Sequence, residues 1–337
     1  MKKWIRVFVG FVIGAVFLYL TLRRLDWDEV SAALSATRWQ FVPAAILFLA
    51  VGYSLRILRW WYILKLARVN VTPQVCAAPF LIGFALNNVL PFRAGDIVRC
   101  VGFAQRLRAS VAQLIGTLVV ERFLDLSALL IYVLVGLSVL PEGKLDHRFI
   151  LSAQILGGAA VLFLVVMVLF AGPIRKLTEA IDRLTHGKET LLHKVLRAAG
   201  QILGTLSMLQ SPVKAFMLIV TSVFVWFFEG GLFAMVGLAL RLDVSAGAYW
   251  FSMGAGTLAT LIPGTPGNVG TFDFFTKEAM QGFDVSPTLA STYAILVHVL
   301  LWLPITLVGG AMMLATGYRA TSTPAPVSEL EETTTLS

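Results

Sequence analysis

The sequence predicts an all-α polytopic membrane protein, and three observations support this fold class. The chain of 337 residues is 58% hydrophobic and only 14% charged, with a mean hydropathy of +0.82, so it is far more apolar than a soluble domain. Several apolar stretches approach or exceed the roughly 20 residues that a helix needs to cross about 30 Å of hydrocarbon. The basic residues, which give a formal charge of +8, are scattered between these stretches. This distribution favours contact with an anionic lipid leaflet over nucleic-acid binding.

Taken in order, the apolar stretches predict about seven or eight transmembrane helices. The first stretch resembles a signal peptide, but it is long and leads to charged residues without a cleavage motif, so we expect a retained span. The predicted crossings cover approximately residues 7–22, 41–55, 79–86, 111–140, 149–170, 213–240, 249–262 and 289–317. We expect residues 1–318 to form one membrane-embedded domain and residues 319–337, rich in Thr, Ser, Pro and Glu, to form a disordered tail.

The distribution of basic residues predicts the orientation of the chain. Lys and Arg are concentrated in residues 56–68 and 172–210, whereas residues 240–249 carry only Arg241. Because basic loops remain on the cytoplasmic side, we expect both basic regions and the N-terminus to be cytoplasmic. The expected location is therefore the cytoplasmic (inner) membrane, with multiple crossings.

Four smaller features have structural interpretations. The aromatic run Trp60–Tyr62 is expected to form a belt at the membrane interface. Apolar residues at helical spacing in 174–184 indicate either an interfacial helix or a solvated connector helix. We expect Cys76 and Cys100 to be free thiols, because two cysteines are too few for a disulfide framework. A lone histidine, His298, is expected to be a satisfied core residue, and no cluster has the spacing of metal ligands.

The segment Asn87–Arg99, which reads NNVLPFRAGDIVR, places two arginines and an aspartate directly after an apolar run. Such a charge at a helix centre costs roughly 2.5 to 3.5 kcal/mol, so charges at membrane depth face a protein interior or a cavity. Pro91 and Gly95 favour a broken helix or a re-entrant hairpin. Backbone of this kind persists at membrane depth only where protein buries it or where it lines a cavity.

A second interrupted segment, PGTPGNVGTFDFF at residues 263–275, has similar spacing. The intervals between a proline, a glycine and the next polar residue agree: Pro91, Gly95 and Asp96 in the first segment, and Pro263, Gly267 and Asn268 in the second. Two proline-broken elements in the two halves of a membrane protein indicate an inverted repeat around a midplane site. We expect two hairpins that enter from opposite sides and meet at one cavity. Asp273 is either a hairpin acid or a helix cap.

The motif ERFLD at residues 121–125 carries the third group of charges. On a helix, Glu121 and Asp125 share a face and repel, whereas Arg122 is placed to pair with Asp125. We then expect Glu121 to lack a local cation. It is either protonated or paired with a cation from elsewhere in the chain, and Arg93 and Arg99 are the nearest candidates in the sequence. These charges either lock two helices together or form a cationic site for a lipid phosphate.

Together, NNVLPFRAGDIVR, ERFLDL and PGTPGNVGTFDFF, with LRWWYILK after the second span, resemble motifs of the flippase-like membrane proteins that share the transmembrane region of lysylphosphatidylglycerol synthases. The resemblance covers about residues 7–317. Two departures are present: Asp96 stands where the family usually has Glu, and Pro266 and Asn268 interrupt the family's P-G-G-x-G pattern. The resemblance implies movement of an anionic or modified phospholipid, or of a polyprenyl-phosphate-linked lipid. It also implies that aminoacyl transfer, which belongs to a separate soluble domain, is absent here.

These observations predict a lipid translocase that is not an enzyme and needs no cofactor. Its expected partners are a membrane lipid and the anionic leaflet, and a homo-oligomer is compatible with the sequence. The alternatives are a membrane scaffold for lipid or envelope synthesis and a membrane-embedded transferase acting on a lipid phosphate. The predicted substrate-binding residues are Asn87, Asn88, Arg93, Asp96, Arg99, Glu121, Arg122, Asp125, Asn268 and Asp273.

Overall fold

The structure is a computed structural model that describes residues 2–23, 25–138, 191–206, 211–261 and 265–317, together with positions 173, 176 and 180. In this part of the chain every regular element is helical. The long helices are α1 (Lys2–Leu22), α3 (Val42–Leu66), α4 (Pro73–Val89), α6 (Val111–Ser138), α8 (Leu191–Leu206), α9 (Pro212–Ala239), α10 (Ala246–Ala259) and α12 (Pro287–Ala315). The shorter ones are α2 (Trp27–Ser35), α5 (Ala94–Val101), α11 (Thr271–Gln281) and the single turns η1 (Trp39–Phe41), η2 (Pro91–Arg93) and η4 (Pro266–Asn268).

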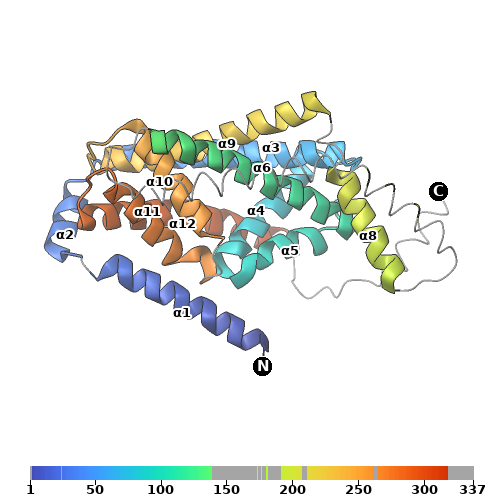
Figure 1. The fold of residues 1–337 in the computed structure, drawn as a ribbon, viewed down its shortest axis with the longest axis horizontal. Coiled ribbons are helices and arrows are strands. Elements are labelled where there is room, and N and C mark those ends of the chain that lie inside the picture. The colour runs from blue at the N-terminus through green and yellow to red at the C-terminus, as the bar shows by residue number, and fades with distance from the viewer. Residues whose placement is uncertain are drawn as a thin grey trace.

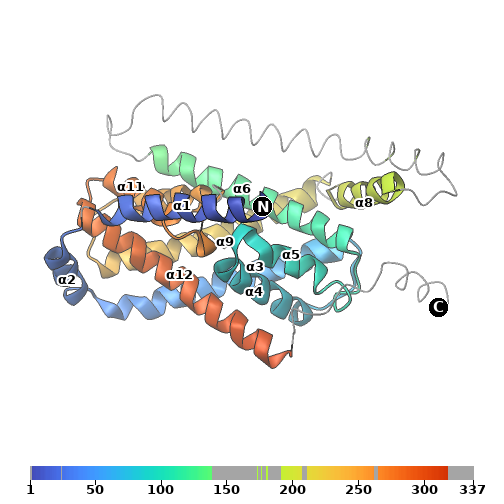
Figure 2. The same cartoon turned by 90° about the horizontal axis from the view of Figure 1, so that it is seen from below.

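The helices pack into an elongated bundle (Figure 1). Helix α3 lies along α9, α10 packs between α6, α9 and α11, and α12 packs on α4 and α11. Helix α1 contacts α11 and lies along the lower edge of the bundle in Figure 1. In the view from below it runs in front of the other helices (Figure 2). Helix α8 packs on α6 at one end of the molecule.

Several helix starts follow directly from the sequence. Proline occupies the first turn of α3, α4, α9 and α12, where its missing N–H has no intrahelical partner to lose. Asp26 caps α2 by accepting hydrogen bonds from the backbone N–H groups of Asp28 and Glu29, and Ser286 caps α12 by accepting from Leu289. These caps satisfy donors that a helix start otherwise leaves free.

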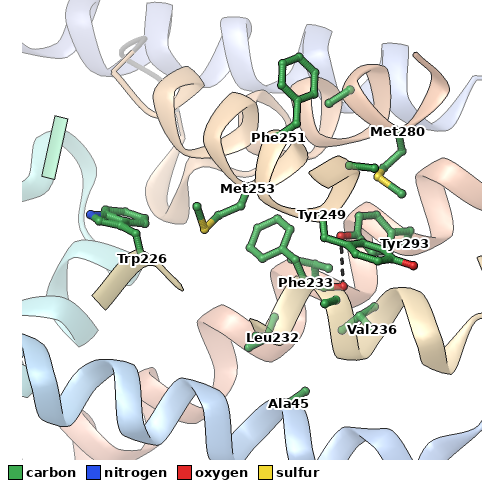
Figure 3. Close-up of a cluster of buried hydrophobic side chains, with 14 of the residues drawn as sticks. Ala45, Trp226, Leu232, Phe233, Val236, Tyr249, Phe251, Met253, Met280 and Tyr293 are labelled. Atoms are coloured by element: carbon green, nitrogen blue, oxygen red, sulfur yellow. Dashed lines mark hydrogen bonds between the residues drawn. The ribbon is translucent and has the colours of Figure 1, made fainter. Parts of the chain in front are cut away.

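The largest core lies between α9, α10, α11 and α12 (Figure 3). Phe233, Tyr249, Met253, Met280 and Tyr293 are buried there, and the Tyr293 hydroxyl donates to the Phe233 carbonyl at 3.2 Å. A second core around Trp60 and Phe80 contains both cysteines, which are free, as predicted. Both are buried, although we expected them near loops. Aromatic packing therefore surrounds the polar groups described below.

Among the described residues, three helical stretches have the length and composition to cross a membrane by themselves: Trp39–Leu66, Pro212–Ala239 and Pro287–Ala315. Helix α6 has 28 residues, but its ERFLD motif interrupts the apolar run. The predicted helices at 7–22, 111–140, 213–240, 249–262 and 289–317 coincide closely with α1, α6, α9, α10 and α12. The predicted span at 149–170, the helix at 174–184 apart from positions 176 and 180, and the tail at 319–337 lie outside the described residues.

The predicted end of the second span is wrong. We placed it near Leu55, but α3 continues without a break to Leu66. Trp60 is 1% exposed and belongs to the core, so it is not part of an interfacial belt. The reason is that a run of aromatic and basic residues has the composition of a membrane-interface segment whether or not neighbouring helices cover it, so composition alone does not show the burial of Trp60.

Candidate functional site

The first interrupted segment is a helix break followed by a short returning helix. Helix α4 ends at Val89, and Phe92 and Arg93 both have left-handed backbone conformations (φ 58° and 52°). These conformations are uncommon for residues other than glycine and occur where the surroundings enforce a tight turn. Helix α5 then packs back on α4. The predicted break at Pro91 is confirmed.

Asn87 and Asp96 hold this turn together by two hydrogen bonds. The Asn87 side-chain oxygen accepts from the Asp96 backbone N–H at 3.1 Å, and its amide donates to the Asp96 carboxylate at 3.1 Å. The pair therefore satisfies a free donor at the start of α5 and fixes Asp96 in a buried position. Arg122, Arg99 and Arg93 also act electrostatically on Asp96.

Gly95 allows α5 to approach α4 closely. A Cβ atom at Gly95 would lie 1.9 Å from the Gly83 carbonyl oxygen and 2.7 Å from the Asn87 nitrogen, both of which are backbone atoms. Backbone cannot rotate away as a side chain can, so Gly95→Ala must separate the two helices. We expect a loss of about 3 kcal/mol of stability, the upper end of the usual cost of overpacking.

Thermal unfolding of the purified protein in detergent measures this effect. The matched control is Gly310→Ala, because a Cβ at Gly310 has nothing within 4 Å. The control should be neutral or slightly stabilising, since alanine favours a helix by up to about 1 kcal/mol over glycine. Equal melting temperatures for the two variants would contradict the close approach of α4 and α5.

Glu121 on α6 pairs with Arg99 on α5. An Nη atom of Arg99 lies 3.0 Å from the Glu121 carboxylate, and neither side chain is more than 1% exposed. The Arg99 guanidinium also lies 4.7 Å from the ring centroid of Trp60 and 5.0 Å from that of Phe80, as cation–π contacts require. The prediction that an arginine of the first segment reaches Glu121 is confirmed. The arginine is Arg99, whereas Arg93 donates to the Thr260 hydroxyl at 3.1 Å.

Arg122 links the two acids of the ERFLD motif. It pairs with Asp125 at 3.7 Å, as predicted, but it also hydrogen-bonds Glu121. The prediction that Glu121 lacks a local cation is therefore wrong. Adjacent residues on a helix point in different directions, yet the long arginine side chain bends back far enough to reach its neighbour.

Three further side chains belong to this group, and none of them is among the predicted site residues. Arg59 on α3 pairs with Asp125 at 2.7 Å, and Arg56, one turn earlier, pairs with Glu229 on α9 and lies 3.9 Å from Asp125. Both arginines are buried, although we had assigned them to a basic region at the membrane surface. A signal was present: Glu229 lies in a long apolar run and needs a cation, and Arg56 and Arg59 lie on one face of the same helix.

We call these seven side chains the buried charge cluster: Arg56, Arg59, Arg99, Glu121, Arg122, Asp125 and Glu229. They come from α3, α5, α6 and α9. Four cations face three acids, so the cluster has one excess positive charge. The Nε–H group of each arginine has no hydrogen-bond partner among the described residues, and a buried donor without a partner is costly. Arg122 is the most exposed member, with 30% of its side chain accessible.

The second interrupted segment contains two backbone conformations that favour glycine. Gly267 and Gly270 have φ values of +67° and +93°. Asp273 is a cap, the second of its two predicted roles, because its carboxylate accepts from the Gly270 N–H at 2.8 Å at the start of α11. His298 on α12 contacts Asp273 at 2.7 Å and the Gly267 carbonyl at 3.1 Å. It is thus a satisfied histidine, as predicted.

The two interrupted segments meet, because the turn η4 contacts both α4 and η2. Helix α12 also bonds to the first segment at this point. Trp302 donates to the Asn88 carbonyl at 3.2 Å, and Asn88 donates to the Thr306 hydroxyl at 2.9 Å. A Cβ at Gly267 would lie 3.0 Å from the Asn88 carbonyl oxygen, so little space separates them. The residue correspondence predicted from spacing is wrong, however: Gly95 lies inside α5, whereas Gly267 lies in the turn η4. Equal intervals in sequence did not produce equal local structure.

Comparison with known proteins identifies the family. Residues 7–309 match the family described as the lysylphosphatidylglycerol synthase TM region. The chain belongs to this family. It is 25% identical to the glycosyltransferase AglD of Haloferax volcanii over 341 residues, which cover 92% of this chain and 54% of AglD. It is 23% identical to a UPF0104 membrane protein of Methanocaldococcus jannaschii over 227 residues, which cover 67% of this chain and 92% of that protein. The chain thus spans about half the length of AglD.

As a member of the lysylphosphatidylglycerol synthase TM family, the chain is a multi-pass membrane protein. Its predicted site residues fall into two groups in the structure. The first group belongs to the buried charge cluster or caps the helix beside it: Asn87, Asp96, Arg99, Glu121, Arg122 and Asp125. The second lies around the meeting point of the interrupted segments: Asn88, Arg93, Asn268 and Asp273.

Proposed function

We propose that the protein is a lipid translocase of the cytoplasmic membrane, with its N-terminus on the cytoplasmic side. Its substrate is an anionic or modified phospholipid, or a polyprenyl-phosphate-linked lipid. The excess positive charge of the buried charge cluster carries this proposal. Buried charges are normally compensated, because an unpaired one is penalised by several kcal/mol. One further negative charge would balance the cluster.

A phosphodiester has the required chemistry. It carries one negative charge, and its oxygens accept hydrogen bonds from guanidinium groups in a planar, two-pronged geometry. Arg93 and Asp96, which lie beside the cluster, add one charge of each sign and leave the excess unchanged. The cluster therefore fits a lipid with one phosphodiester better than a lipid with a diphosphate.

Arg122 is the proposed point of contact for the headgroup. Its side chain is 30% exposed, whereas those of Arg56, Arg59 and Arg99 are at most 4% exposed. The acyl chains would remain in the surrounding lipid while the phosphate reaches this arginine. Binding there offers Arg122 a third anion besides Glu121 and Asp125.

A membrane-embedded transferase is the second candidate, and the glycosyltransferase name of AglD favours it. A transferase needs an acid or base that is free to move a proton. In the cluster, Glu121, Asp125 and Glu229 each pair with at least one arginine, which disfavours that role. A scaffold without transport remains the third interpretation.

Purified protein in liposomes with a fluorescent phosphodiester lipid tests the translocase. We expect transbilayer movement of this lipid and slower movement of an analogue with a diphosphate. Arg122→Gln should slow movement by about 10-fold or more, because a charged hydrogen bond is worth about 1.5 to 3 kcal/mol and 1.4 kcal/mol is a factor of ten. Arg122→Lys should also slow it, since lysine keeps the charge without the planar fork.

The matched control is Arg106→Gln, which removes an exposed arginine outside the cluster and should leave the rate unchanged. Melting temperatures of both variants separate lost function from lost folding. A new lipid product would favour the transferase. The absence of both movement and product with a folded protein would favour the scaffold.

A further inference from the structure

Arg93 is held in the structure by a neutral partner. Its guanidinium donates to the Thr260 hydroxyl at 3.1 Å, and the ion pairs among the described residues do not include it. By contrast, each of the four arginines of the buried charge cluster pairs with an acid. A guanidinium binds a carboxylate or a phosphate through two parallel hydrogen bonds, which one hydroxyl cannot offer. Arg93 therefore has a stronger type of partner to gain.

The backbone of the first interrupted segment directs Arg93 toward α10. Phe92 and Arg93 are two successive residues with left-handed backbone conformations. Such conformations persist only where the surroundings enforce them, and they concentrate at ligand-binding and switching regions. Behind the turn, Asn87 fixes the start of α5 through Asp96. The Arg93 side chain then reaches Thr260, the residue that follows the last turn of α10.

Arg93 and Arg122 are neighbours of the same buried acid. Both arginines act electrostatically on Asp96, and Arg122 also acts on Arg93. Both are partly exposed, whereas the other arginines of the cluster are buried. Two cations that repel each other gain most from an anion that contacts both. A phosphodiester has two non-bridging oxygens, so it offers one to each guanidinium.

Thr260 is suited to hold Arg93 temporarily. Its hydroxyl donates to the Thr257 carbonyl of its own helix at 2.7 Å, and its oxygen lone pairs remain available to accept from Arg93. Departure of Arg93 therefore leaves the hydroxyl donor paired. The Arg93 bond joins the first turn, η2, to the end of α10, and η2 also contacts η4 of the second segment. Loss of this bond removes a connection at the place where the two segments meet.

We propose that Arg93 is a second phosphate ligand, which Thr260 holds away from the site until a lipid arrives. In the lipid-free state Arg93 donates to Thr260. When the phosphate of a lipid contacts Arg122, Arg93 exchanges the hydroxyl for a phosphate oxygen, and both arginines then hold the headgroup. The exchange links headgroup binding to the contact between the interrupted segments. This inference rests on the proposed function, because it assigns a further ligand in the same site.

Lipid binding in detergent tests the exchange without any lipid movement. The probe is dihexanoyl phosphatidylglycerol, a short-chain phosphodiester lipid, and calorimetry measures its affinity. Thr260→Val removes the acceptor at nearly constant shape, so the affinity should rise several-fold, because Arg93 no longer has to leave a partner before it binds. Arg93→Gln should weaken binding by about 10-fold or more, the value of one charged hydrogen bond.

Two controls separate the hydroxyl from general effects of substitution. Thr221→Val is matched to Thr260→Val, because the Thr221 hydroxyl bonds within its own helix at an exposed position. It should bind the probe as the unaltered protein does. Thr260→Ser retains the hydroxyl and should also preserve the affinity. Thr260→Ala lacks it and should show the same gain as Thr260→Val, so the result does not depend on the folding of one variant.

The double variant Arg93→Gln, Thr260→Val shows whether Thr260 acts through Arg93. If it does, the double variant binds as weakly as Arg93→Gln alone, and the gain from Thr260→Val disappears. A gain of equal size with and without Arg93 would overturn the exchange. An unchanged or reduced affinity in both Thr260→Val and Thr260→Ala, with melting temperatures near that of Thr221→Val, would overturn it as well.

Two further measurements identify the ligand and separate this inference from the proposed function. Inorganic phosphate should bind more weakly than the lipid probe, because acyl chains add apolar contacts; equal binding would assign the site to the free anion and overturn the lipid assignment. If the variants bind the probe in the expected order but no labelled lipid crosses liposomes, the Arg93 site stands and the translocase proposal fails. If lipid crosses equally fast with Arg93→Gln, the translocase stands and the Arg93 inference fails.

Discussion

Replacement of Asp125 by asparagine should lower the free energy of unfolding by about 3 to 5 kcal/mol, the cost of removing one partner from a buried ion pair. Asp125 accepts from Arg59 at 2.7 Å and lies within 4 Å of Arg56 and Arg122. It also accepts from the Trp226 indole at 3.2 Å. An asparagine has the same shape but no charge, so it leaves four arginines with only two acids in the cluster.

Chemical or thermal unfolding in detergent measures this loss, and Asp243→Asn is the matched control. Asp243 is exposed in the turn after α9, so its replacement should change stability by less than about 0.5 kcal/mol. A variant at position 125 that is as stable as this control would contradict the central position of Asp125.

In Asp125→Asn the excess positive charge of the cluster also rises from one to two. Added phosphodiester lipid should therefore stabilise Asp125→Asn more than the unaltered protein.

Glu121→Gln should be comparably destabilising, by about 3 to 5 kcal/mol, because Arg99 is completely buried and Glu121 is the acid with which it pairs in the described structure. Arg99→Gln should cost less, since Glu121 retains Arg122. The double variant should be less destabilised than the sum of the single variants, because neither charge is then left alone. A double-mutant cycle scored by unfolding in detergent measures this difference.

Arg93 provides the internal control for the cycle. It donates to Thr260 at the end of α10, whereas the ion pairs of Glu121 among the described residues are with Arg99 and Arg122. Arg93→Gln and Glu121→Gln should therefore be additive within about 0.5 kcal/mol. Strict additivity for Arg99 with Glu121 would contradict the pairing, and strong coupling for Arg93 with Glu121 would require a different arrangement of the first segment.

Much of the helical framework could be predicted from the sequence. Long apolar runs predicted α1, α6, α9, α10 and α12 within a few residues, because hydropathy and length are properties of a continuous stretch. Pro91 indicated the break after α4, because proline restricts its own backbone and that of the preceding residue. This effect is also local in the sequence. The partnership of Glu121 with the first segment followed from the cost of a buried charge.

The details of the two breaks were harder to predict. The equal spacing of proline and glycine indicated matched structure, yet Gly95 lies inside a helix. A glycine is needed there because the carbonyl of Gly83 leaves no room for a side chain. Gly267 instead lies in a turn with a positive φ. Glycine thus serves two different purposes, the close approach of two helices and a backbone conformation with positive φ, and the spacing of residues does not distinguish them. The inverted repeat and the entry of the hairpins from opposite sides remain predictions.

The sequence by itself determined the membrane class, most helices and the two breaks, because each depends on local hydropathy and backbone chemistry. Only the tertiary structure decided which charges meet. Arg56 and Glu229 are 173 residues apart, and Arg59 and Asp125 are 66 apart. Each pair forms because α3 packs against α6 and α9. An arginine in an apolar stretch signals only that a partner is needed; the packing of helices distant in sequence supplies that partner.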